Sequence, residues 1–537
     1  MKKPLSKHLQ GVIALLAMSN VGNAQFVTPT IPDQFIANVT TPSPCHDDLV
    51  VNCDMLQTSA GGMPIKAVAW DDRIGSTYLY FEDNAGNAAP IEQFEGLRPD
   101  IVLADDKFNP NNYRAAVVYI DGGYYPHINF YLLTGVGTSS FTVTQTGSIP
   151  LSPNPVNHNT LGILYDSEGM PHIDMWSDVN NPNPATGLAG MYEYVVTWEE
   201  GYNIMYAYGD VSTNSWNGMP IPLPISPQKD QPDVSCYTEV NTGQRVACFV
   251  YRTANGLEVT ELDMATLAHA GASPYTVTTK KGWIPRIESM SQYNNRIEPA
   301  KWEVVCSYGD FPTATAYNAA SLGAPQDLGG LTGDDSKSVC VAAGLQFTAG
   351  ATDLGNKQYT AGIYQWASQN LYAREIDANV GIITNPNYYQ INTNPMGAWP
   401  SPGEYCLADA SKTLALSNCS NTGEYLLSAW YDGHDAGNGT GGAIWMKLSP
   451  NTTPMVFKAT SLDNIQSGND LTIYPNPAKD RAYLPKKGTY QVYDMKGQQV
   501  LEVTIANDNT IDVSALPIGL YIIRTVEGNS VYRFTKE

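Results

Sequence analysis

The chain has 537 residues, of which 30 are basic and 52 are acidic, so its formal net charge is −22. This length allows more than one domain, and a hydrophobic content of 43% is enough to build sizeable buried cores. The acidic excess argues against nucleic acid as a partner, because binding a phosphate backbone requires basic side chains.

The N-terminal residues have the pattern of a cleaved secretory signal. Lys2 and Lys3 precede the apolar run 11–18, and small residues lie just before Gln25. This order predicts a signal peptide at residues 1–24. The run is far shorter than the roughly 20 apolar residues that a membrane-spanning helix needs, and no later run is long enough. We therefore expect no transmembrane segment.

The sequence that follows repeats a two-strand unit. Each copy has an apolar strand ending in an aromatic residue, a polar or glycine turn, and a second alternating strand. The aromatic ends of successive copies are about 50 to 80 residues apart. The seven copies pair residues 65–70 with 77–81, 115–119 with 127–132, 194–198 with 202–206, 246–251 with 257–262, 302–308 with 313–317, 360–366 with 371–376 and 425–430 with 443–448.

Several copies follow a further strand that opens on proline or a polar residue, at 99–104, 232–236, 285–289 and 338–341. Four strands for each copy is the content of one propeller blade. We therefore predict an all-β fold in which residues 25–448 form a seven-bladed β-propeller. Six or eight blades stay open, because 126–130 and 171–175 also align and Tyr165 could begin a further unit. A pair of stacked β-sandwiches is the alternative fold, but it predicts shorter, hairpin-sized repeats.

The eight cysteines all follow the predicted cleavage site, and an even set in an exported chain is compatible with disulfides. Cys236 and Cys248 flank the turn at 241–243 symmetrically, so a hairpin centred there would set them opposite each other. Buried thiols are the alternative for the whole set. The other pairs rest on closeness in sequence and on elimination, and are Cys45 with Cys53, Cys406 with Cys419, and Cys306 with Cys340.

Candidate ligand-binding residues are few, because no linear signature of a hydrolase, metalloprotease or phosphate-binding loop occurs in the chain. Tyr124 and Tyr125 are loop aromatics that could contact a ligand. His127 and His172 share a local context, which favours a structural role in a strand over a ligand role. We expect no cofactor, although the acidic body, with a charge of about −26, leaves a structural calcium ion open.

Residues 449–470 show no sustained alternation, which predicts a linker that a processing protease could reach. Beyond it, residues 471–537 read as a separate, small Ig-like β-sandwich. Pro475 and Pro477 end a first strand, because proline lacks an N–H group. A hairpin follows at 489–494 and 499–505, with Gly497 in its turn, and closing strands follow at 511–524 and 531–534.

The order of short motifs in this tail resembles the type A C-terminal sorting domain of the type IX (Por) secretion system. The motifs are Tyr-Pro-Asn-Pro-Ala, Gly-Gln-Gln-Val, Ile-Asp-Val-Ser-Ala-Leu and Pro-Ile-Gly-Leu-Tyr, followed by a basic and aromatic end. The resemblance implies recognition by the secretion machinery, export across the outer membrane of a Gram-negative cell, and removal of the tail with release or surface anchoring of the body. The residues that match the family pattern, and that we expect to shape the recognised surface, are Pro475, Asn476, Pro477, Gly497, Gly519 and Tyr521.

Two classes of function remain open for the body. The first is a secreted or cell-surface binding module that presents loops to a glycan or a protein. The second is an exported polysaccharide-degrading enzyme, a lyase or a hydrolase, with its site at the propeller mouth. A convergent cluster of His, Tyr, Arg and carboxylate groups would favour catalysis, and a flat neutral surface would favour binding.

Overall fold

The computed structural model describes residues within 33–39, 50–156, 170–289, 302–392, 409–450 and 478–536, with shorter gaps inside these ranges. Every regular element in these ranges is a β-strand, so the all-β prediction is confirmed. None of the described residues forms a helix long and apolar enough to span a bilayer. The chain divides into two compact units, Met1–Val456 and Phe457–Glu537. The predicted signal peptide and linker lie outside the described residues.

The described strands of the first unit form seven antiparallel sheets. The first three contain β2 (Val51–Leu56), β3 (Ile65–Asp71), β4 (Ser76–Glu82) and β5 (Glu92–Glu95); β6 (Leu97–Asp105), β7 (Tyr113–Ile120), β8 (Pro126–Thr134) and β9 (Thr142–Pro150); and β10 (His172–Pro182), β11 (Ala189–Glu200), β12 (Asn203–Asp210), β13 (Ser215–Trp216) and β14 (Ile221–Pro222).

The next three sheets contain β15 (Asp230–Thr238), β16 (Arg245–Thr253), β17 (Gly256–Asp263), β18 (Ala268–His269) and β19 (Tyr275–Thr278); β20 (Gly282–Ser289), β21 (Trp302–Tyr308), β22 (Thr315–Ala320) and β23 (Gln326–Asp327); and β24 (Ser336–Ala343), β25 (Gln358–Gln365), β26 (Asn370–Asp377), β27 (Ile382–Ile383) and β28 (Tyr389–Gln390). The seventh contains β29 (Asp409–Thr413), β30 (Tyr425–Asp432), β31 (Gly442–Pro450) and the N-terminal β1 (Gln34–Val39).

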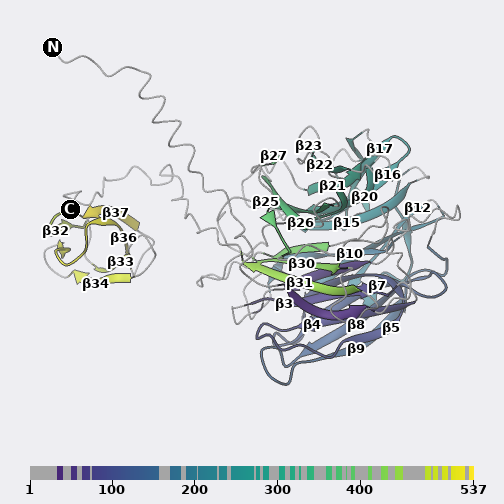
Figure 1. The fold of residues 1–537 in the computed structure, drawn as a ribbon, viewed down its shortest axis with the longest axis horizontal. Helices are drawn as coiled ribbons and strands as arrows, with labels where there is room; N and C mark the ends of the chain where they lie inside the picture. Colours follow the sequence, from purple (N-terminus) through teal and green to yellow (C-terminus); the bar gives the residue numbers. More distant parts are fainter. Residues whose placement is uncertain are drawn as a thin grey trace, which may run out of the picture. The chain divides into compact units, whose positions relative to one another are not determined.

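The first strands of these sheets contact one another in a closed cycle. Strand β2 contacts β6, and the contacts continue through β10, β15, β20, β24 and β29 back to β2. The seventh sheet has the order β1-β31-β30-β29, so a strand from the N-terminus completes a sheet built by the end of the body. Figure 1 shows the late strands β30 and β31 in green beside the early strand β3 in purple, and side chains of these three strands share one core.

All seven predicted strand pairs are confirmed as neighbouring antiparallel strands, from β3 with β4 to β30 with β31. The predicted preceding strands are the first strands β6, β15, β20 and β24. The alignment of 126–130 with 171–175 does not hold, because 172–175 belong to the first strand of the third sheet, whereas 126–130 belong to the third strand of the second sheet. Tyr165 lies outside the described residues.

Apolar side chains fill the space between neighbouring sheets, because successive residues of a strand point to opposite faces. Between the first two sheets, Ala67, Leu79, Ile101, Val117 and Leu133 share one core and are almost completely buried. Complete burial of a valine, leucine or isoleucine side chain stabilises the fold by about 1.5–3 kcal/mol. Both faces of an inner strand are covered in this way, which explains the nearly continuous apolar runs in the sequence.

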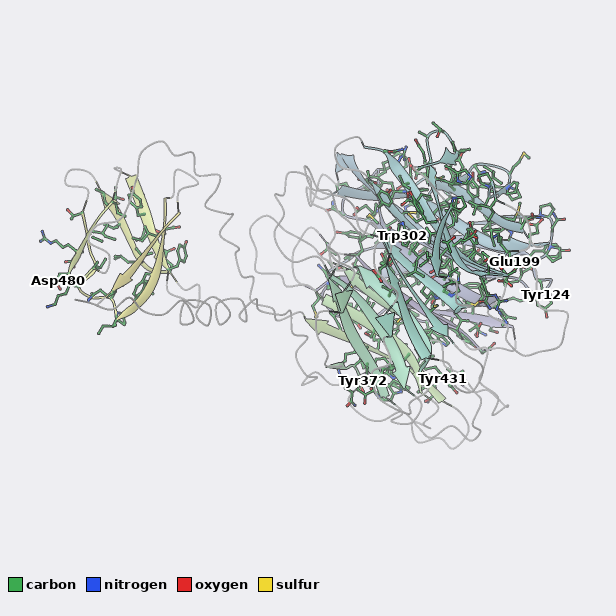
Figure 2. All side chains as sticks on the ribbon, turned by 90° about the horizontal axis from the view of Figure 1, so that it is seen from above. Tyr124, Glu199, Trp302, Tyr372, Tyr431 and Asp480 are labelled. Carbon is green, nitrogen blue, oxygen red and sulfur yellow. The ribbon has the colours of Figure 1, made fainter. Side chains whose placement is uncertain are left out.

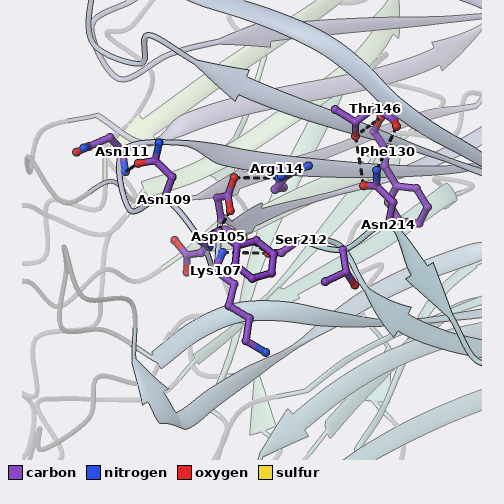
Figure 3. A network of polar contacts seen from close by, with 12 residues as sticks. Asp105, Lys107, Asn109, Asn111, Arg114, Phe130, Thr146, Ser212 and Asn214 are labelled. Carbon is purple, nitrogen blue, oxygen red and sulfur yellow. Dashed lines mark hydrogen bonds and ion pairs between the residues drawn. The ribbon is translucent and has the colours of Figure 1, made fainter.

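Polar contacts join the second and third sheets at the end where β6 finishes (Figure 3). The Lys107 N–H donates to Ser212 Oγ over 3.0 Å, and the Ser212 hydroxyl donates to the Asp105 carbonyl. The Asn214 side chain donates to the Thr146 carbonyl and accepts from the Thr146 hydroxyl, each over 3.2 Å. These bonds satisfy turn backbone groups that the packing of the two sheets would otherwise leave without partners.

The predicted disulfide between Cys236 and Cys248 is wrong. Strand register places Cys236 opposite Ala247 and Cys248 opposite Ser235, so the two thiols are offset by one residue. Side chains one position apart point to opposite faces of a sheet, and the two cysteines lie in different cores. No disulfide joins Cys306 to Cys340, and Cys53 carries none either. Cys45, Cys406 and Cys419 lie outside the described residues.

The second unit contains two sheets around one core. One sheet has the order β34-β33-β36-β37 and the other pairs β32 with β35. The shared core includes Ala482, Tyr490, Ile511 and Ile523. The strands are β32 (Arg481–Tyr483), β33 (Gly488–Tyr493), β34 (Gln499–Ile505), β35 (Thr510–Asp512), β36 (Gly519–Thr525) and β37 (Val531–Lys536).

The predicted hairpin of the tail is the antiparallel pair β33 and β34. Gly519 begins β36, and the ring of Tyr521 is buried while its hydroxyl donates to the Pro517 carbonyl over 2.7 Å. This bond fixes the entry into the strand. Pro475, Asn476, Pro477 and Gly497 lie outside the described residues.

Candidate functional site

Near the start of four consecutive first strands, a proline is followed by a charged or ionisable residue. The pairs are Pro99-Asp100, Pro171-His172, Pro232-Asp233 and Pro285-Arg286. Register shifts interrupt the pairing just before Asp100, Asp233 and Arg286. A bulge of this kind bends the strand and re-aims the following side chain. Bulges therefore orient Asp100, Asp233 and Arg286, whereas His172 is the first residue of β10.

Two of these bulges contain a non-glycine residue in the left-handed region. Arg98 has a φ of 56° and Gln231 a φ of 49°, and each immediately precedes the proline. This conformation costs roughly 1–2 kcal/mol for an L-residue. Such strain persists only where surrounding contacts over-determine the backbone, and it is commonly found beside functional sites.

The four side chains meet around His172. Its Nδ1 atom lies 3.2 Å from Asp100 Oδ2 and 3.6 Å from Asp233 Oδ1. Its Nε2 atom lies 3.0 Å from Arg286 Nη1. A guanidinium group can only donate, so Nε2 accepts and the imidazole proton sits on Nδ1, facing Asp100. We call Asp100, His172, Asp233 and Arg286 the central cluster.

The carboxylates of the central cluster also bind backbone of the next sheet. Asp100 Oδ2 accepts the Ile173 N–H over 3.0 Å, and Asp233 Oδ2 accepts the Ile287 N–H over 2.9 Å. The side chains of His172, Asp100 and Asp233 are only 5%, 14% and 9% exposed. The central cluster therefore joins four sheets from a largely buried position.

Two neighbouring aspartates make the same kind of bond, from a carboxylate to a backbone N–H of the next sheet. Asp54 Oδ2 accepts the Leu103 N–H, and Asp174 Oδ2 accepts the Cys236 N–H, each over 2.6 Å. Desolvation raises the pKa of Asp174 to about 7, and the nearby Asp54 carboxylate adds to the rise. The first strands therefore surround an acidic centre.

Asp71, the last residue of β3, is a further buried acid. Its Oδ2 atom accepts the Arg98 N–H over 2.7 Å, while Oδ1 has no hydrogen-bond partner among the described residues. Burial raises the pKa of Asp71 to about 7, although the Arg98 backbone and charge act in the opposite direction. The carboxylate thus holds the bulged residue Arg98 in its left-handed conformation.

A second candidate site is the turn that joins β7 to β8, at the end of the sheet where β6 begins. Asp121 Oδ1 accepts the N–H groups of Gly123 and Tyr125, each over 2.9 Å. The Tyr124 N–H donates to the Asp121 carbonyl, and the Val156 N–H donates to the Tyr124 carbonyl over 2.8 Å. The turn is therefore closed internally and fastened to the segment that follows β9. We call residues 121–125 the tyrosine turn.

Both tyrosines of this turn face solvent. Tyr124 is 45% and Tyr125 is 36% exposed, and Figure 2 places Tyr124 at the margin of its unit. Tyr124 has a φ of 67°, a left-handed conformation that is uncommon for an aromatic residue. A Cβ atom on Gly123 would lie 2.8 Å from the Tyr125 ring, so this ring rests on the glycine. Hydrogen bonds therefore fix the backbone that carries both rings, at the cost of backbone strain at Tyr124.

Charged and aromatic neighbours surround the tyrosine turn. His127 Nε2 lies 3.1 Å from Asp121 Oδ2, and the His127 ring packs against Tyr119 with centroids 5.6 Å apart. The Glu95 carboxylate lies close to Gly122, where a Cβ atom would come within 2.7 Å of Oε1. Three of the four ligand candidates, Tyr124, Tyr125 and His127, therefore belong to one site.

Asp100, Asp233 and Arg286 were not predicted as site residues from the sequence. The signal was present in the proline that recurs near the start of four of the first strands. We aligned Pro171-His172 with Pro126-His127, which belongs to a third strand, and so missed the equivalent first-strand positions. Among the described residues, no group of three or more His, Cys, Asp or Glu side chains is arranged to hold a metal ion.

Comparison with protein families supports the reading of the tail. Residues 472–536 match the family described as a secretion system C-terminal sorting domain, as the resemblance predicted. No curated protein sequence matches the chain.

Solved structures that match the chain include AofleA from Arthrobotrys oligospora, at 8% identity and a TM-score of 0.38, covering 69% of this chain and 94% of that one. The Aleuria aurantia lectin, described as a six-bladed β-propeller, has 11% identity and a TM-score of 0.33, covering 79% and 99%. The polysaccharide lyase Uly1 has 8% identity and a TM-score of 0.37, covering 81% and 95%. TM-scores this low add nothing to the fold that strand pairing establishes.

Proposed function

We propose that this chain is an exported β-propeller of seven blades, delivered to the cell surface or the medium, that binds a glycan or a protein. The proposed domains are a signal peptide at 1–24, the propeller at 25–448, a linker at 449–470 and an Ig-like sorting domain at 471–537. The sorting-domain match at residues 472–536 is the observation that carries the export. The closed cycle of first strands supports a propeller with one blade for each sheet.

The export test removes residues 471–537 in the native host and measures the protein in periplasm, on the cell surface and in the medium. We expect the truncated body to stay folded and to be retained in the periplasm, because the two units have separate cores. A matched control replaces exposed Val500 of the tail with Ala, which should leave export normal. Normal levels of the truncated body outside the cell would contradict the proposal.

The tyrosine turn supports a binding role for the body. Binding loops are commonly held on a rigid scaffold, and exposed aromatics in a strained but well-bonded turn fit such a role. The turn lies on the second sheet, whose four strands pair along most of their length. A ligand would therefore meet two pre-positioned rings and lose little conformational entropy from the protein.

A polysaccharide-degrading enzyme is the second candidate, and the central cluster is the observation that favours it. Histidine, arginine and two carboxylates converge there, as a catalytic site would require. Its test measures reducing-end release by the wild-type chain and by His172→Ala. If the wild-type chain releases reducing ends and a folded His172→Ala variant does not, the proposed function becomes catalysis and not binding. We favour binding, because His172 is buried and both of its ring nitrogens have partners.

A further inference from the structure

We propose that the tyrosine turn is a binding site for a neutral oligosaccharide, with Tyr124 and Tyr125 stacking on sugar rings. The inference rests on the proposed binding function and names its ligand class and its site. Tyrosine offers a broad apolar face and a polar hydroxyl at low entropic cost, since it has only two side-chain torsions. A pyranose ring presents the complementary combination of an apolar C–H face and peripheral hydroxyl groups.

The polar groups beside the rings match hydroxyl chemistry. The segment that follows β9 is fastened to the turn by the Val156 N–H bond to Tyr124. In this segment the Ser152 hydroxyl donates to Glu200 Oε2 over 2.8 Å, and the Asn154 amide donates to Glu200 Oε1 over 2.5 Å. Asn154 is exposed, and the oxygen of its side-chain amide is an acceptor for a hydroxyl group. Ser152 is buried and its Oγ accepts the Asn154 N–H over 3.1 Å, so it positions Asn154.

Charge excludes anionic glycans from this site. Asp121 belongs to the turn, Glu95 lies against Gly122, and Glu200 is bound to the segment that Tyr124 contacts. The body as a whole carries about −26. A uronate, a sulfate ester or a sialic acid would meet like charges at close range, which disfavours binding.

The same carboxylates are not arranged for a cationic peptide. Both oxygens of Asp121 are used by N–H groups of the turn and by His127. Both oxygens of Glu200 accept hydrogen bonds, from Ser152 and Asn154. Two exposed rings are also much smaller than the roughly 1,000 Å² that a specific protein interface buries. A small neutral ligand is therefore the occupant that the site fits.

Tyr124→Gly is the most informative variant, because it removes the ring and also relieves the backbone strain at the positive φ of this position. Glycine adopts positive φ without strain, so this change should leave the folded body at least as stable as the wild type. Tyr125→Ala removes the second ring. Phe108→Ala is the matched control, since Phe108 is an aromatic residue with 69% exposure between β6 and β7, at the opposite end of the same sheet.

The experiment screens the full chain on immobilised neutral oligosaccharides and on sialylated, sulfated and uronate-containing chains, then measures affinity for the best neutral chain by calorimetry. We expect binding to neutral chains, a loss of tenfold or more in Tyr124→Gly and in Tyr125→Ala, and wild-type affinity in Phe108→Ala. Neutral-glycan binding that survives both tyrosine variants would overturn the site and leave the binding function standing. Binding only to anionic chains or only to a protein would overturn the ligand class. Release of reducing ends from the oligosaccharides by the full chain would overturn the proposed binding function itself.

Discussion

Lys447 Nζ lies 3.0 Å from Asp33 Oδ1, and this ion pair joins two residues 414 positions apart at the closure of the ring. Lys447 belongs to β31, and Asp33 immediately precedes β1, which pairs with β31. The Lys447 ammonium also donates to the Ile391 carbonyl over 2.8 Å. The side chains of Lys447 and Asp33 are 1% and 8% exposed, so the pair is shielded from solvent.

Breaking this pair should destabilise the whole body. We expect Lys447→Met to lower the free energy of unfolding by about 3–5 kcal/mol, because it leaves the buried Asp33 carboxylate without its cation. The measurement is denaturant unfolding of the body. The matched control is Lys107→Met, which removes a lysine from a more exposed pair with Asp210 at 3.7 Å and should cost no more than about 1 kcal/mol. Equal effects of the two substitutions would show that the closure contributes no special stability.

Deleting β1 tests the closure in a second way. Without residues 34–39, strand β31 becomes an open edge, because β1 is its neighbour on that side. Exposed edges pair with other chains. We therefore expect the deleted body to associate, as measured by light scattering, while the intact body does not. Gln34 also donates to Glu82 Oε2 of the first sheet over 2.7 Å, so its loss removes a link between the first and the last sheet.

The raised pKa of Asp71 should make the stability of the folded protein depend on pH. Its pKa is about 7 in the folded protein and 3.8 ordinarily, so the unfolded chain loses this proton at lower pH than the folded protein. The contribution of Asp71 to stability therefore falls as pH rises from about 4 to about 7. Asp71→Asn has no such proton, so its stability relative to the wild type should rise over this range by up to about 4 kcal/mol. Thermal unfolding at a series of pH values measures the difference.

Asp83→Asn is the control for this experiment, with the opposite sign. Burial opposes ionisation of Asp83, but hydrogen bonds from Asn87, Gly137 and Ala85 outweigh it and hold the pKa of this carboxyl below its ordinary value. Replacing Asp83 should therefore destabilise the protein at neutral pH and have less effect in acid. If both variants shift stability in the same direction across the pH range, the assignment for Asp71 is wrong.

The thiols of Cys236 and Cys248 should be present and unreactive in the folded protein. Both side chains are buried, and burial together with the Asp174 carboxylate raises the pKa of Cys236 well above its ordinary value. Alkylation depends on the thiolate. We therefore expect iodoacetamide to label these two residues only after unfolding, as peptide mapping by mass spectrometry would show. Recovery of a disulfide-linked peptide containing both residues would contradict the observed strand register.

Local features of this fold were predictable, whereas features that depend on register or on distant pairing were not. Apolar alternation and turn residues located all seven central hairpins, because each is specified within about 20 residues of sequence. The pairing of Cys236 with Cys248 failed on a slip of one residue, which reverses the face of every side chain. Strand β1 was missed, because its partner β31 lies some 400 residues away and no local pattern marks it. The tyrosine turn was found from its aromatics, but its bond to Val156 is likewise non-local.

The central cluster should show strong energetic coupling between His172 and Arg286. Their contact spans the third and fifth sheets, and Asp100 and Asp233 hold His172 from the other side. In a double-mutant cycle of His172→Ala and Arg286→Met, we expect a coupling energy of about 1–3 kcal/mol by denaturant unfolding. The exposed pair Arg245 and Glu193 is the comparison, with side chains about 40% exposed and an expected coupling below about 1 kcal/mol. Additive effects at His172 and Arg286 would mean that their contact contributes nothing to the stability of the body.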